Sequence, residues 1–153
     1  LLCINLVGCL ESKAVNSNNV EESYKSEKVI ELYVPDDNIS KWVVEEKNVD
    51  ISELKNVITA LKDTEKCCIP KETEVNSIKI ENKIAYVDLS KDFDDSQTGS
   101  SAAVRVKIYS IVNTLCLNEC FNVEGVKFLI DGKEVETIGP MDVSLIKTPK
   151  LEL

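Results

Sequence analysis

The chain has 153 residues, of which 43% are hydrophobic and 29% are charged, and its formal net charge is −9. This length suits one folded domain with a tail, and the acidic balance argues against a nucleic-acid partner, which would need clustered cations to displace counterions from phosphate. The sequence contains no histidine, which excludes Ser-His-Asp and Cys-His catalysis and histidine metal sites. We therefore expect a protein that is not an enzyme and carries no cofactor.

The first nine residues predict the end of a bacterial lipoprotein signal peptide. A nearly apolar run leads into Leu6-Val7-Gly8-Cys9, which resembles the lipobox: an aliphatic residue, a small or β-branched one, glycine and cysteine. The Cys9 thiol can carry a diacylglyceryl group, whose two acyl chains make a stable anchor. We expect cleavage between Gly8 and Cys9, lipid attachment at Cys9, and a signal whose start precedes Leu1. The alternative is a buried N-terminal strand with an incidental Gly-Cys.

Residues 10–27 predict a flexible polar tether. They are rich in Ser, Asn, Glu and Lys, with Tyr24 as their one aromatic residue, so they cannot bury enough apolar area to order themselves. Residues 28–153 would then form the domain, held just outside the membrane through lipidated Cys9.

The domain opens with two predicted strands. The β-rich run 28–34 is stopped by Pro35 and the turn residues that follow it. Residues 41–48, which include Trp42, predict a second strand. We interpret Trp42 as a half-buried strand residue, with an anchoring contact to a partner as the alternative.

A first helix is predicted after these strands. Asp50 and Glu53 have the spacing of a capping box at a helix start. The apolar side chains that follow fall on one helical face: Ile51, Leu54, Val57, Ile58 and Leu61.

Two hairpins are predicted further along. The β-rich runs 75–80 and 84–89 are joined across a short turn, and runs 126–130 and 133–135 are joined by Asp131-Gly132. Asp-Gly between β-rich runs is typical of a type I′ turn, which needs positive φ at both central residues.

A second helix is predicted between the hairpins, capped by Ser100 or Ser101. The apolar residues Val104, Ile108, Ile111, Val112 and Leu115 fall on one helical stripe. Asn113 and Thr114 interrupt this apolar helix, and we interpret their side chains as bonding to nearby backbone, with a partner contact as the alternative. The resulting order β-β-α-β-β-α-β-β predicts an α+β fold with two helices packed on a mainly antiparallel sheet.

Five segments of the domain resemble the GerMN domain of sporulation and spore germination. They are Ile30–Pro35, Ile69–Val75 ("IP-x-x-T-x-V"), Ala85–Ser90 ("A-x-V-D-L-S"), Ile111–Leu115 ("I-V-N-T-L") and Val126–Lys133, which ends in Asp-Gly-x. The chain departs from the pattern in two places. It has Asp63-Thr64 where the family often has Gly-Pro, and Gly139-Pro140 where Gly-His is frequent.

The resemblance implies a lipoprotein on the outer face of the cytoplasmic membrane of a spore-forming bacterium, with a fold like the ring-building modules of secretion systems. It also implies a non-catalytic role in a channel-type complex between mother cell and forespore. The partners would be other envelope proteins of that complex, with copies of the chain itself in a ring as one option. The alternative is a substrate- or cell-wall-binding lipoprotein, which would need a concave apolar pocket.

Two groups of residues remain as candidates for metal chemistry. Asp88, Asp92, Asp94 and Asp95 lie within eight positions, but an EF-hand starting at Asp92 would need glycine where Gln97 stands. A solvated loop is the alternative.

Cys67, Cys68, Cys116 and Cys120 form two pairs about 48 residues apart, which is not a zinc-ribbon spacing. Three interpretations of these four cysteines stay open: buried thiols, one disulfide or a metal site.

Overall fold

The computed structural model describes residues 26–94 and 100–153. Its elements run in the order β1 (Glu27–Pro35), β2 (Trp42–Asp50), α1 (Lys55–Lys62), β3 (Val75–Glu81), β4 (Ile84–Leu89), η1 (Lys91–Asp94), α2 (Ser101–Leu117), η2 (Glu119–Phe121), β5 (Gly125–Ile130), β6 (Lys133–Glu134), β7 (Thr137–Ile138) and β8 (Met141–Asp142).

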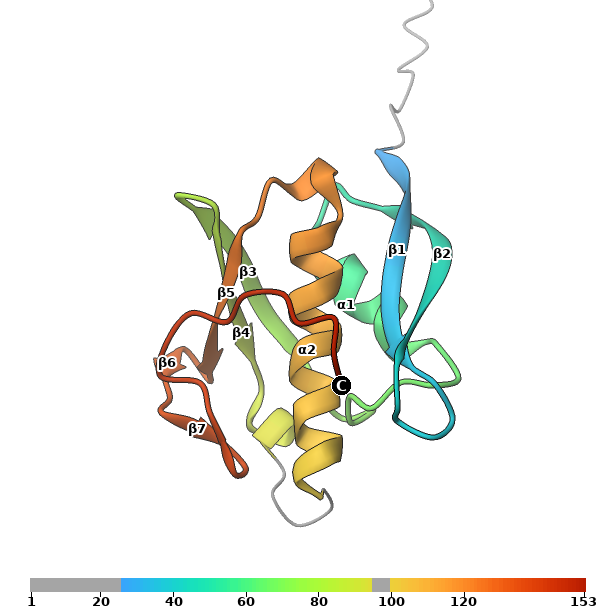
Figure 1. Ribbon diagram of the computed structural model, residues 1–153. Coiled ribbons are helices and arrows are strands. Elements are labelled where there is room, and N and C mark those ends of the chain that lie inside the picture. The colour runs from blue at the N-terminus through green and yellow to red at the C-terminus, as the bar shows by residue number, and fades with distance from the viewer. Residues whose placement is uncertain (1–25, 95–99) are drawn as a thin grey trace, which may run out of the picture.

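The described strands form a separate β1-β2 hairpin, a four-stranded sheet and a short β7-β8 pair, and α2 lies between the β1-β2 hairpin and the four-stranded sheet (Figure 1). β1 pairs with β2 in the hairpin, and the sheet has the order β3-β4-β5-β6. This arrangement confirms the predicted α+β class and the predicted order of the main elements. One pairing differs from a simple antiparallel sheet: β4 and β5 are parallel, because the chain returns through α2 between them.

The central helix α2 is buried over most of its surface. Ser100 caps it as predicted, its hydroxyl oxygen accepting a hydrogen bond from the Ala103 N–H at 3.3 Å. The predicted apolar stripe is fully buried and contacts both β1 and β5. On the sheet side, Phe128 stacks on Phe93 with ring centroids 6.1 Å apart. The helix therefore joins the hairpin to the sheet through one continuous core.

The first helix begins later than predicted, and the capping box is wrong. Strand β2 continues to Asp50, which pairs with Glu27, and α1 starts only at Lys55. The Asp50 carboxylate instead accepts hydrogen bonds from the Ser52 N–H at 3.0 Å and the Ser26 hydroxyl at 2.8 Å. An Asp side chain that bonds its own chain two residues on makes a turn rather than a helix cap.

The outer edge of β1 is closed by side chains of α2 and the residue after it. The Thr114 hydroxyl accepts a hydrogen bond from the Tyr33 N–H at 3.1 Å. The Asn118 amide accepts from the Glu31 N–H at 3.0 Å and donates to the Glu31 carbonyl at 2.8 Å. These side chains do what a third strand would do, because they satisfy backbone groups that an edge strand otherwise leaves unpaired.

The last ten residues, 144–153, form a segment that we name the strap, which crosses α2 from the sheet to the hairpin (Figure 1). The Lys150 carbonyl accepts hydrogen bonds from the Trp42 indole N–H and the Asn113 amide, both at 2.8 Å. The Asn113 side-chain oxygen accepts from the Lys150 N–H at 2.8 Å. Trp42 is half-buried in β2, as predicted. The prediction for Asn113 and Thr114 is wrong, because their partners are distant in the sequence rather than nearby.

The β5–β6 turn has the backbone that its Asp-Gly sequence predicts, with φ of 47° at Asp131 and 77° at Gly132. Gly132→Val is expected to lower the free energy of unfolding by about 1–3 kcal/mol, because valine is strained at positive φ. An added Cβ meets nothing closer than Asp88 Oδ2 at 3.9 Å, so the cost comes from the backbone alone. Urea denaturation measures it, and an unmoved midpoint would contradict this account of the turn.

Candidate interaction surface

The predicted lipid site lies outside the described residues. Leu6, Val7, Gly8 and Cys9 all precede residue 26, so the structure places none of them. Within the described residues, no helix is long and apolar enough to cross a membrane.

The four cysteines of the domain are free thiols. Cys67 and Cys68 follow α1 and are half-buried, Cys116 is half-buried in the last turn of α2, and Cys120 in η2 is exposed. Burial raises the pKa of Cys67 and Cys68, and it raises the pKa of Cys116 to about 11. These three thiols are therefore protonated near neutral pH, and a protonated thiol is a poor nucleophile and metal ligand.

The aspartates of the predicted acidic cluster do not act together in the described part of the chain. Asp94 accepts a hydrogen bond from the Gly139 N–H at 2.7 Å, which fixes the turn before β8. The Asp88 carboxylate on β4 accepts a hydrogen bond from the Gly132 N–H instead. Asp95 and Gln97 lie outside the described residues. Among residues 26–94 and 100–153, no three His, Cys, Asp or Glu side chains gather as metal ligands would.

Several residues that carry the GerMN resemblance hold the domain together. The Asp88 carboxylate accepts a hydrogen bond from the Gly132 N–H at 2.9 Å and so joins β4 to the β5–β6 turn. The Ser90 hydroxyl accepts from the Glu74 N–H at 3.0 Å, and the Ser90 N–H donates to the Glu74 carbonyl at 2.9 Å. Asn113 and Thr114 fix the strap and β1, as shown above. The motif side chains thus bond other parts of the fold.

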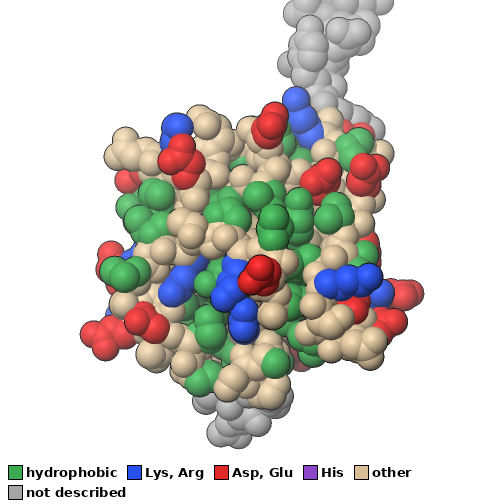
Figure 2. Space-filling model, viewed as in Figure 1, with side chains coloured by type: hydrophobic (Ala, Val, Ile, Leu, Met, Phe, Trp, Pro, Cys, Tyr) green, Lys and Arg blue, Asp and Glu red, His purple; other side chains and the backbone are tan. Residues whose placement is uncertain are grey.

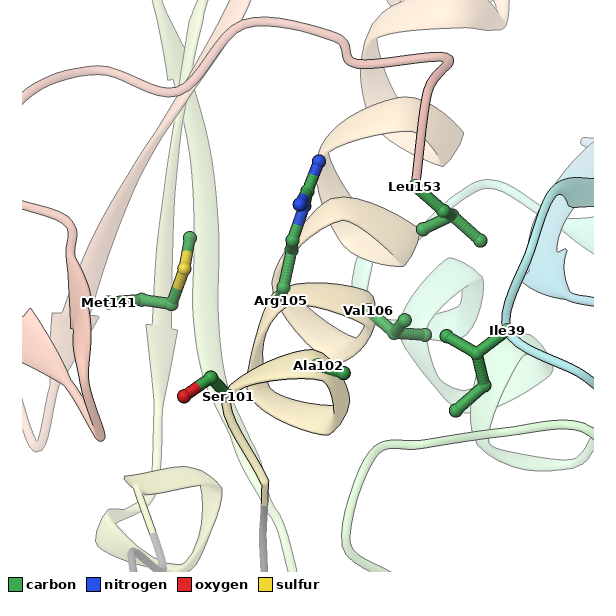
Figure 3. A pocket seen from close by; sticks show the side chains of 7 residues that line it. All are labelled: Ile39, Ser101, Ala102, Arg105, Val106, Met141 and Leu153. Atoms are coloured by element: carbon green, nitrogen blue, oxygen red, sulfur yellow. The ribbon is translucent and has the colours of Figure 1, made fainter.

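An apolar trough of about 340 Å³ crosses the first two turns of α2, and we name it the α2 trough (Figure 3). Ala102, Arg105 and Val106 lie along α2 at the spacing of one helical face. Ile39, Leu153 and Val106 point toward one another on the side of the β1–β2 turn. The remaining lining residues are Ser101 at the start of α2 and Met141 of β8.

Ile39 lines the trough in a backbone conformation that isoleucine rarely adopts. It follows a turn closed by the Ile39 N–H donating to the Asp36 carbonyl at 3.0 Å, and its φ is 53°. Glycine or asparagine usually fills this left-handed position after a turn, and a β-branched residue there is a genuine outlier. The Asp36 carboxylate secures the turn by accepting from the Ser40 N–H at 2.6 Å and the Ser40 hydroxyl at 2.7 Å. These bonds hold the pKa of Asp36 below its usual value.

Arg105 is the only arginine of the sequence, and it brings a cation into the trough. Its guanidinium donates one long hydrogen bond, 3.4 Å, to the Glu152 carbonyl on the strap. Its side chain is half-buried, and it makes no ion pair with the residues that the structure describes. Since a guanidinium carries five N–H donors in a fixed fork, Arg105 has donors to spare for a ligand in the trough.

Exposed apolar side chains also occur on the strap. Figure 2 shows hydrophobic side chains gathered over the middle of the face that carries α2 and the strap, with Lys and Arg side chains and an acidic side chain below them. Leu145 and Leu151 of the strap are 73% and 64% exposed, and Ile39 is 40% exposed. A second hollow of about 460 Å³ near the end of α1 is lined by polar residues, including Lys62 and Lys71, and by no apolar residue of the described chain. Sequence reasoning missed the α2 trough, because its walls come from four separate segments.

The comparisons with known proteins agree with this fold. The model of the family described as "Germane: Sporulation and spore germination" matches residues 23–136. No curated protein matches the chain. A 2.5 Å crystal structure from Clostridium perfringens, of a protein described as a lipoprotein, shares 22% identity with a TM-score of 0.54, covering 80% of this chain and 87% of that one.

Two further solved structures come from the sporulation protein GerM of Bacillus subtilis. Its first GerMN domain shares 18% identity with a TM-score of 0.55, covering 82% of this chain and 96% of that one. Its tandem GerMN domains share 20% identity with a TM-score of 0.60, covering 84% of this chain and 46% of that one. The chain thus spans about half the length of the tandem structure.

Proposed function

The chain belongs to the Germane family, whose description is "Sporulation and spore germination". From this membership we propose that the chain is a non-catalytic interaction module of the cell envelope. In this proposal lipidated Cys9 holds it at the outer face of the cytoplasmic membrane. There it binds other proteins of a channel-type complex between mother cell and forespore.

One observation carries the non-catalytic part of the proposal. Asp88, Ser90, Asn113 and Thr114, which are motif residues with chemically useful side chains, bond other parts of the fold. A catalytic site would instead present a nucleophile next to a general base, and the half-buried thiols described above are protonated. The exposed apolar face over α2 and the strap supports a binding role, because such faces mark interaction sites on soluble domains.

The lipid anchor rests on the sequence and on one structural neighbour. Leu6-Val7-Gly8-Cys9 has the lipobox pattern, and the Clostridium perfringens structure of the same fold is described as a lipoprotein. The predicted anchor lies 17 residues before Ser26. β1 starts at the opposite end of the domain from the β1–β2 turn and the α2 trough (Figure 1). Nine strand residues span about 30 Å, so the anchored chain can present the trough to partners away from the bilayer.

Cys9→Ser is expected to abolish both lipid labelling and processing at Gly8-Cys9 in the cells that make the protein. The reason is that serine lacks the thiol to which the diacylglyceryl group attaches. Metabolic labelling with a fatty acid and the size of the mature protein measure the two effects, with Cys3→Ser as the matched control. Equal labelling of the Cys9→Ser and wild-type proteins would overturn the anchor.

The role in sporulation is tested in the same strains. Loss of the gene should lower the number of heat-resistant spores or their germination, and the wild-type protein should restore it more fully than Cys9→Ser. Crosslinking before and during sporulation should capture envelope proteins with the wild-type chain. Unchanged sporulation and germination in the deletion strain would contradict the proposal.

The α2 trough also favours a second candidate function, a binding protein for a small substrate or cell-wall fragment. Its volume of about 340 Å³ lies at the lower end of the range for small-molecule sites. A small molecule that binds the purified chain and whose binding is lost on changing Arg105, in a strain that sporulates normally without the gene, would favour this alternative.

A further inference from the structure

We propose that the α2 trough binds an extended peptide segment of a partner protein, in which an apolar side chain lies next to a carboxylate. This inference rests on the proposed function, because it names the kind of partner that the interaction module takes. The apolar side chain would pack among Ile39, Val106 and Leu153, and the carboxylate would pair with Arg105.

The apolar half of the site follows from Ile39. A strained residue persists only where the surrounding structure holds it, and the hydrogen bonds of Asp36 hold this turn. The turn aims a branched apolar side chain at Leu153 and Val106 while leaving it 40% exposed. Glycine or asparagine would suit the backbone better, so the turn itself gives no reason for isoleucine. Packing against Val106 and Leu153 uses part of this side chain, and its exposed 40% is open to an apolar ligand group.

The polar half follows from Arg105. A guanidinium forms its strongest contacts as paired hydrogen bonds with a planar oxyanion, such as a carboxylate. In the described structure Arg105 has only the long bond to the Glu152 carbonyl. The chain as a whole has a net charge of −9, so an acidic ligand is repelled at long range. Attraction is local to this cation, which makes the position of the carboxylate selective.

The shape of the site favours a peptide over a small molecule. Small-molecule sites bury most of the surface of the ligand, whereas Ile39 at the wall of this trough is 40% exposed, and Leu151, two residues before the lining residue Leu153, is 64% exposed. An extended peptide can place one side chain in the trough and lay its neighbours on this adjoining apolar surface. A free carboxylate of similar size would leave that surface uncovered.

The experiment uses the full chain as its unlipidated Cys9→Ser form and a fluorescein-labelled peptide of alternating leucine and glutamate. Fluorescence polarisation gives the affinity. We expect Arg105→Gln to weaken binding about tenfold, the value of one charge-assisted contact. The same loss is expected when glutamine replaces glutamate in the peptide, with little further loss when both changes are combined. Lys133→Gln, which removes an exposed cation of β6 outside the trough, is the matched control and should bind as wild type.

Ile39→Asn tests the apolar half separately from folding. We expect it to keep the melting temperature, because asparagine tolerates positive φ, while weakening peptide binding about fivefold. Chemical-shift changes on adding the peptide should centre on residues 39, 105 and 153.

Three results would each overturn the peptide site. The first is an equal loss of peptide affinity in Arg105→Gln and Lys133→Gln, and the second is chemical-shift changes centred on other residues. The third is hexanoate that competes for the site as well as the unlabelled peptide does. None of these outcomes would remove the lipid-dependent crosslinks and the sporulation defect, which test the proposed function.

Discussion

Asn118→Ala is expected to lower the free energy of unfolding by about 2–4 kcal/mol. The buried Asn118 amide makes three hydrogen bonds: two to the backbone of Glu31 and one, at 2.7 Å, to the Thr114 carbonyl. Removing a side chain that satisfies buried backbone groups costs more than the bonds themselves, because those groups are left without partners. Urea denaturation gives the change in stability, and hydrogen exchange should show faster exchange of the Glu31 amide.

Asn48→Ala is the matched control for this substitution. Asn48 lies in β2 of the same hairpin but is exposed, and exposed substitutions of this kind usually change stability by less than about 0.5 kcal/mol. If Asn118→Ala were as mild as Asn48→Ala, the closure of the β1 edge by α2 would not stabilise the domain.

Asn113→Ala is expected to lower the free energy of unfolding by about 2–3 kcal/mol and to release the strap. Asn113 is fully buried, and its amide makes paired hydrogen bonds to the backbone of Lys150. Alanine leaves a cavity and removes the bonds that hold residue 150 on α2. Hydrogen exchange should quicken most at the Lys150 amide.

Trp42→Phe separates this effect from a general weakening of the strap. It removes the indole donor to the Lys150 carbonyl, which also accepts from Asn113, and part of the bulk of a half-buried side chain, so its cost should be about 1 kcal/mol. A Trp42→Phe effect larger than that of Asn113→Ala would show that the strap is held mainly from the hairpin.

The periodic elements could be predicted from the sequence, because their signals are local. Alternating β-rich runs and the Asp-Gly turn gave the strands, and the apolar stripe gave α2. The start of α1 could not be predicted. Asp50 carries the chemistry of both a helix cap and a turn, and only its pairing with Glu27 at the far end of β1 decides between them.

The strap and the trough could not be predicted, because their signals are spread over the chain. Residues 144–153 have no helical or strand period, and they take their place because Asn113 and Trp42 reach the backbone of Lys150. The trough needs the β1–β2 turn, the start of α2, β8 and the chain end together. The turn at residues 36–39 offered no local signal either, because the positive φ of Ile39 is seen only in the structure.

The closure of β1 by residues 114 and 118 also sets the order in which the chain can fold. An isolated two-stranded hairpin is marginal in water, and the groups that complete the β1 edge lie 81 and 87 residues further along the chain. The hairpin therefore gains its stability only when α2 has formed and the intervening loop has closed, a step whose entropy cost slows folding. When the chain is synthesised from its N-terminus, β1 and β2 emerge first. The outer edge of β1 then stays exposed and without these hydrogen-bond partners until the end of α2 has emerged.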